Sequence, residues 1–169
     1  MRLVIIVLCS ALASLAFSED KIAVIDMQQA MFASKYAQNM AKEASESADF
    51  VALSAKAERS AADLQSMAKE AETKRLTWST EEAAEHQKKM SYTKADYDLA
   101  VQKIQGEQQQ LQQKIMQELT PQFQEALSEV AKGEGITLLL RRESVIIADP
   151  KNDLTAKVVD KLNQITLEK

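Results

Sequence analysis

The sequence predicts a mostly helical α+β protein, in which a long antiparallel helical hairpin projects as a coiled-coil arm from a small three-strand β body. Between Gln28 and Lys132 the chain contains one glycine and one proline, so its helices can be far longer than the globular average. Apolar strand-like runs occur only at the two ends of the exported chain. Three short strands bury little surface, so we expect assembly to cover the second face of their sheet.

Residues 1–18 are predicted to be a secretory signal peptide. Arg2 precedes an apolar stretch that is shorter than the roughly 20 residues of a membrane span, and small side chains stand near Ser18 for signal peptidase. An uncleaved membrane anchor is the alternative. Cleavage after Ser18 would remove Cys9, the only cysteine, so the mature chain could form neither a disulfide nor a thiolate-ligated metal site.

Composition excludes several classes of function. The full chain has 21 Lys and Arg against 25 Asp and Glu, and loss of Arg2 leaves 20 against 25, a net charge of −5. Nucleic acids and anionic membranes need a basic surface, so neither is expected as the main partner. No nucleophile with a base, metal cluster or phosphate loop is recognisable, so we predict no enzyme and no catalytic, cofactor-binding or metal-ligating residues.

Two polar features are predicted to be structural. His86 is the only histidine, and it has no neighbouring group that catalysis or metal binding would require, so we expect it on the solvated surface. Asp149 and Asp153 do not have the spacing of a calcium-binding EF-hand loop. A turn followed by a helix cap accounts for both carboxylates.

The first body strand is predicted within residues 19–28, in the apolar run 22–27. The arm is expected to occupy residues 29–132, with its turn near residues 76–80. Ser79 followed three residues later by Glu82 has the pattern of a capping box, which marks a helix start.

The two arm helices are therefore expected over about residues 29–76 and 80–132. At 1.5 Å per residue each would be roughly 70 to 80 Å long. Arms of nearly equal length would bring the chain back beside its first strand.

Small and apolar side chains recur along both arm helices at coiled-coil spacing. From Ala37 to Ala55 their positions are separated by four or three residues, and a phase shift near Phe50 indicates a stutter. In the second helix a repeat of seven runs from Ala83 to Leu111. The alternative, an ordinary helical-bundle core, would need more large apolar residues than these alanine- and glutamine-filled seams provide.

Residues 133–169 are predicted to return to the body. Before them, Pro121 should kink the second helix, or end it so that it restarts with Thr120 as the N-cap. Two glycines then favour a left-handed helix stop. Residues 136–140 and 145–148 are predicted to form a hairpin that the first strand joins, followed by a short C-terminal helix. One side of that helix carries Leu154, Val158, Leu162 and Ile165.

Three stretches, in order, resemble the Skp/OmpH family of periplasmic chaperones. They are KIAVIDMQQAMF after the signal peptide, ELTPQFQEALSEVAKGEGITLLL, and VIIADPKNDLTAKVVDKLN. The resemblance implies a homotrimer whose body combines strands from three chains and whose helical arms enclose a cavity. It also implies that this cavity holds unfolded outer-membrane proteins in the periplasm without ATP. The best-known members are strongly basic, whereas this chain is acidic, so contact with membrane or lipopolysaccharide is doubtful.

Two groups of residues are predicted to carry this function. The trimer body is expected to use Ile22, Val24, Ile25, Ile136, Leu138, Leu140, Val145 and Ile147. Client contact at the arm tip is expected from Trp78, Met67, Met90 and Leu76. Trp78 could instead staple the two helices together, and the methionines could be gap fillers. The alternative function is a structural coiled-coil envelope scaffold that binds no client.

Overall fold

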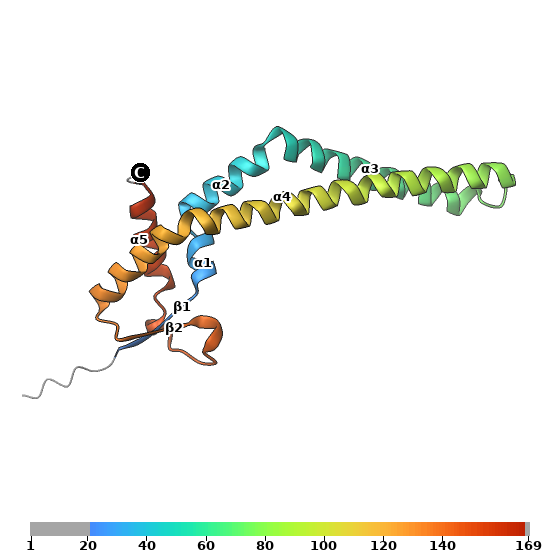
Figure 1. Ribbon diagram of the computed structural model, residues 1–169. Helices are drawn as coiled ribbons and strands as arrows, with labels where there is room; N and C mark the ends of the chain where they lie inside the picture. The colour runs from blue at the N-terminus through green and yellow to red at the C-terminus, as the bar shows by residue number, and fades with distance from the viewer. Residues whose placement is uncertain (1–20, 168–169) are drawn as a thin grey trace, which may run out of the picture.

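The computed structural model describes residues 21–167, so the predicted signal peptide and Cys9 lie outside the described residues. Figure 1 shows a small base from which a long helical arm extends. The elements, in order, are β1 (Ile22–Ile25), α1 (Met27–Phe32), α2 (Lys35–Glu46), α3 (Ala48–Lys74), α4 (Thr80–Glu134), β2 (Leu138–Arg141), the 3-10 helices η1 (Arg142–Ser144) and η2 (Pro150–Asn152), and α5 (Thr155–Leu167). We call α2, α3 and the first part of α4 the arm, and the remaining elements with the last part of α4 the base.

Helix α4 is a single helix of 55 residues, and both of its ends follow local sequence signals. The predicted capping box is present: the Glu82 amide donates to Ser79 Oγ at 3.2 Å, and the Ser79 amide donates to Glu82 Oε2 at 2.7 Å. The helix ends at Gly135, whose φ of 67° lies in the left-handed region that glycine adopts without steric cost. At 1.5 Å per residue, α4 spans roughly 80 Å.

The expectation of one continuous helix over residues 29–76 is wrong, because serines interrupt it twice. Ser34 and Ser47 are the N-caps of α2 and α3, and their hydroxyls accept from the amides of Ala37 and Phe50. Both hydroxyls also donate to carbonyls three residues earlier, so each serine replaces helical hydrogen bonds with local ones. Figure 1 shows the consequence: α2 rises away from α4, and α3 returns to it.

Of the two expectations for Pro121, a kink or a restart at Thr120, the restart is wrong, because α4 continues through Pro121. The Thr120 hydroxyl donates back to the Met116 carbonyl at 2.5 Å, within the helix, instead of capping a new one. Leu119 and Phe123 on either side are both buried in the base. Their packing holds the helix in place where proline removes a backbone hydrogen bond.

The sheet has two described strands rather than the three expected. β1 and β2 pair in parallel, with Ile22 opposite Leu138 and Ile25 opposite Arg141. Residues 145–148 do not form a strand, because η1 interrupts the chain directly after β2 and no hairpin is made. On the other side of β1, the Leu154 amide donates to the Val24 carbonyl at 3.0 Å.

Nearly all of the described core lies in the base. It joins β1, α1, the end of α4 and α5 through Ala23, Ile25, Ala30, Met31, Ala37, Ile115, Leu119, Phe123, Ala126, Leu154, Val158 and Leu162. Beyond Ala37, the buried residues that the structure describes on the arm are Ala57, Ser60 and Ala100, all with small side chains. The arm is therefore a close seam between two helices, and the base is the packed part of the fold.

Candidate functional site

The base leaves several large aliphatic side chains exposed among the described residues. Ala23, Ile25 and Leu139 pack into the core, so their neighbours along each strand point to the opposite face, where Val24 is buried and Ile22, Leu138 and Leu140 remain partly exposed. We call the exposed aliphatic side chains of this face and of the stretch that follows η1 the sheet patch; its members are Ile22, Leu138, Leu140, Ile146 and Ile147. The last two are the most exposed, at 97% and 87%, on the stretch between η1 and η2. A patch of large aliphatic side chains is typical of an interaction surface.

The structure separates the eight predicted body residues into three groups. Ile22, Leu138, Leu140 and Ile147 belong to the sheet patch. Val24 and Ile25 are buried inside the chain itself, whereas Ile136 and Val145 are partly buried. The sequence reasoning missed Ile146, because it assumed the alternation of a strand that does not form; the unbroken aliphatic run of residues 145–147 was the available signal.

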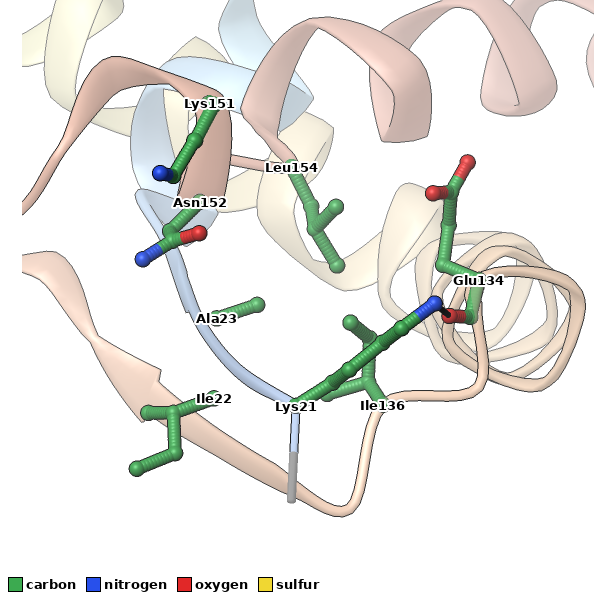
Figure 2. A pocket seen from close by; sticks show the side chains of 8 residues that line it. All are labelled: Lys21, Ile22, Ala23, Glu134, Ile136, Lys151, Asn152 and Leu154. Atoms are coloured by element: carbon green, nitrogen blue, oxygen red, sulfur yellow. Dashed lines mark hydrogen bonds between the residues drawn. The ribbon is translucent and has the colours of Figure 1, made fainter. Parts of the chain in front are cut away.

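A cleft of about 600 Å³ lies beside the sheet, where α4 ends and β1 begins (Figure 2). Two lysines line it, but both already have partners. Lys21 Nζ donates to the Glu134 carbonyl at 3.1 Å, and Lys151 Nζ lies 3.2 Å from Asp149 Oδ2. The Lys21 contact connects the start of β1 to the end of α4 across this cleft.

The same junction is reinforced from α5. Lys157 Nζ donates to Glu134 Oε1 at 2.6 Å, and this hydrogen bond, together with the lysine charge, lowers the pKa of the Glu134 carboxyl. The pair is largely exposed, so it orients the end of α4 more than it stabilises the fold.

The arm tip is closed by an aromatic pair. Trp78, in the turn, packs against His86 of α4 with ring centroids 4.5 Å apart. The His86 side chain is only 12% exposed, so the expectation of a surface histidine is wrong. Its Nε2 is buried without a hydrogen-bond partner among the described residues and lies 4.0 Å from Glu70 Oε2 of α3. Trp78 therefore packs on α4 at the turn.

The other predicted tip residues are only partly brought together. A pocket of about 300 Å³ is lined by Met67 and Trp78 with Glu70, Glu82, Glu85, His86 and Lys89. Met90 is half-buried and lies outside the lining of this pocket, and Leu76 points into solvent at 90% exposure. Lys74 donates to Glu70 at 3.0 Å, and this hydrogen bond lowers the pKa of the Glu70 carboxyl. The pocket is thus small and largely acidic.

A comparison with protein families identifies the family of this chain. A family model described as outer membrane protein (OmpH-like) matches residues 21–162, which include the whole arm and nearly all of the base. This chain belongs to the OmpH-like family. No curated protein sequence compared with this OmpH-like chain matches it at a significant level.

One solved structure that resembles the OmpH-like chain comes from Caulobacter crescentus CB15 and is described as a candidate outer membrane chaperone (OmpH-like). The two share 18% identity, with 86% of this chain and 85% of the other covered, and a TM-score of 0.49. The family assignment rests on the match over residues 21–162 and not on this likeness.

The described part of the OmpH-like chain was expected to hold no metal site, and the features of two other kinds of site are absent from it. Among residues 21–167, no three His, Cys, Asp or Glu side chains are grouped so that they could hold a metal ion. Within the same residues, no helix combines the length and apolar character needed to cross a membrane.

Proposed function

We propose that this protein is an exported holdase chaperone that keeps unfolded outer-membrane proteins apart in the periplasm, without ATP. Membership of the OmpH-like family supports a chaperone role. The observation that carries the proposal is the combination of a long arm with almost no core of its own and a base that leaves large aliphatic side chains exposed. Such a base favours assembly, and such arms can surround a cavity.

The assembly proposed is a homotrimer formed through the sheet patch. Burying one exposed isoleucine side chain contributes roughly 1.5 to 3 kcal/mol, so covering Ile146 and Ile147 in each of three copies is a substantial driving force. Residues 145–148 would gain strand partners in a neighbouring copy, which would also satisfy their backbone groups. The predicted body residues Ile22, Leu138, Leu140 and Ile147 would then lie at the interface.

The mechanism proposed is sequestration. A client held between three arms cannot meet a second unfolded chain, so aggregation is prevented without a catalytic step. Many weak contacts from three arms would add up to useful affinity, and no single side chain would be decisive. The break at Ser47 would let the arms bow to different extents for clients of different size.

Native mass spectrometry tests both parts of this proposal. The mature protein is mixed with a urea-unfolded outer-membrane β-barrel protein as the urea is diluted. We expect a complex of three copies with one client. A bare trimer beside aggregated client would contradict the chaperone function, and a monomer at working concentration would contradict the assembly.

A pair of matched variants connects the assembly to the sheet patch. Ile146→Ser with Ile147→Ser removes two exposed aliphatic side chains from the base, and we expect it to dissociate the trimer. Leu76→Ser removes an equally exposed aliphatic side chain from the arm tip, and we expect it to leave the trimer intact. Equal behaviour of the two variants would show that the sheet patch is not the interface.

A coiled-coil envelope scaffold without clients is the second candidate. The packing of Trp78 on His86 favours it, since a tip fixed in this way offers less apolar surface to a client. The same mixing experiment decides between the two candidates, because a scaffold would form the trimer and leave the client to aggregate.

A further inference from the structure

A groove of about 360 Å³ lies between α1 and α4, at the root of the arm. It is lined by Gln28 and Phe32 of α1 and by Gln109, Gln112, Gln113 and Met116 of α4. No charged side chain lines it, although 27% of the whole sequence is charged. We call this surface the glutamine groove.

The four amides of the glutamine groove are free to bind a ligand. None of them has a hydrogen-bond partner among the described residues, and all four glutamines are exposed. Each amide offers two N–H donors and a carbonyl acceptor. Phe32 and Met116 are only partly buried and pack on the core below, so they provide an apolar floor.

We propose that the glutamine groove binds the main chain of an extended, uncharged segment of unfolded polypeptide. Every residue of such a segment except proline carries one N–H donor and one carbonyl acceptor, and glutamine can pair with both. Lysine or glutamate could serve only one of the two and would favour clients of opposite charge. The apolar floor would receive side chains from one face of the extended segment.

This inference rests on the proposed holdase function and assigns one part of that function, contact with the main chain of the client, to the glutamine groove. The arm offers few large apolar side chains, so hydrophobic contact alone explains only part of how a client would be held. Main-chain recognition depends little on sequence, which suits a protein that must accept many different chains. The inference therefore places main-chain binding at the root of the arm and not at its acidic tip.

Fluorescence anisotropy with the mature full-length chain tests the inference. The probe is a labelled, extended peptide of threonine, valine and serine, compared with a copy whose main-chain amides are N-methylated. Loss of two or three hydrogen bonds should weaken binding roughly tenfold. We expect this loss on N-methylation of the peptide, and also for the variant Gln109→Ala with Gln112→Ala and Gln113→Ala.

The control is Gln110→Ala with Gln117→Ala, which removes two exposed glutamines of α4 that lie outside the groove lining. Alanine is a stronger helix former than glutamine, so α4 is retained in both variants. We expect the control to bind the unmodified peptide as tightly as the wild type does. The N-methylated peptide keeps its carbonyl acceptors, so its binding should weaken less in the groove variant than binding of the unmodified peptide does.

Three results would overturn the inference. Unchanged binding by the groove variant would show that the groove is not the site. Equal loss of binding to both peptides in the groove variant would show that the groove does not recognise main-chain N–H groups. A changed assembly mass for the groove variant would show that the groove is a contact between copies. Failure of the proposed function is separate: wild-type protein that binds the peptide but lets the unfolded barrel protein aggregate would overturn the holdase and not the groove.

Discussion

The base and the arm of this protein are held by different kinds of contact. In the base, large side chains such as Met31, Leu119 and Leu162 are fully buried, and they come from segments far apart in the sequence. Along the arm, α3 and α4 meet through residues as small as Ala57 and Ala100. Stability is therefore concentrated in the base, whereas the arm contributes shape and surface.

Polar contacts also differ between the base and the arm. In the base, the Asp26 amide donates to Thr155 Oγ1 at 3.0 Å, in a partly buried position. Across the arm, Lys56 and Asp96 form an ion pair at 2.7 Å, but both side chains are about half exposed. Exposed ion pairs typically contribute less than about 1 kcal/mol. We expect the arm to open locally at a lower free energy than the base does.

The largest effect is expected from Leu119→Ala, in the core of the base. The side chain is almost fully buried, so its removal should lower the free energy of unfolding by about 2 to 5 kcal/mol. Urea unfolding at a fixed chain concentration measures this. Leu76→Ala at the exposed tip is the control and should change the value by less than about 0.5 kcal/mol. Similar values for both variants would remove the distinction between base and arm.

Ala100→Leu should separate the arm helices while leaving the base folded. A larger side chain in this close seam costs about 1 to 3 kcal/mol. Hydrogen exchange should show faster exchange of arm amides and unchanged protection in β1 and α5. Ala95→Leu, on the exposed side of α4, is the control and should leave exchange unaltered. Slower arm exchange in Ala100→Leu would mean that the seam has unused space.

Ser47→Ala tests the cap between α2 and α3. Loss of an N-cap hydroxyl costs about 1 kcal/mol, so the free energy of unfolding should fall by that amount. Ser45→Ala, two residues earlier inside α2, is the matched control and should be nearly neutral. If both variants unfold at the same urea concentration, Ser47 does not stabilise the break in the arm.

The smallest effect is expected from the Glu134 and Lys157 pair in the base. Because the folded-state pKa of Glu134 is lowered, its contribution is present above the ordinary glutamate value of about 4.3 and is lost as the pH falls through the lowered value. The urea midpoint of the wild type should exceed that of Glu134→Gln at neutral pH and converge with it in acid. A constant difference down to acidic pH would contradict the ionic origin of the contact.

Local signals in the sequence predicted the features that depend on a few neighbouring residues. The capping box of Ser79 and Glu82 and the glycine stop after α4 both formed, because each requires only its own backbone and the adjacent side chains. Leu154, Val158 and Leu162, predicted to line one side of the last helix, are all buried in the base. The breaks at Ser34 and Ser47 were not predicted, since a serine within a helical pattern does not by itself indicate whether the helix continues or ends.

Features that depend on distant neighbours were not predictable in the same way. Residues 145–148 have strand composition, but a strand needs a partner, and η1 leads them away from β2. His86 was expected in solvent because nothing in its neighbourhood shows that Trp78 folds back onto it. Ile146 was missed as part of the sheet patch for the same reason, since its exposure follows from the missing strand.

The parallel pairing of β1 with β2 also has a consequence for how this chain folds. More than a hundred residues separate the two strands, and closing so long a flexible loop costs entropy that short strands repay poorly. The helical hairpin removes most of that cost, because α3 and α4 can pair progressively from their local turn and so bring β1 and β2 toward each other. We therefore expect the arm, which adds least to the final stability, to set the rate at which the base forms.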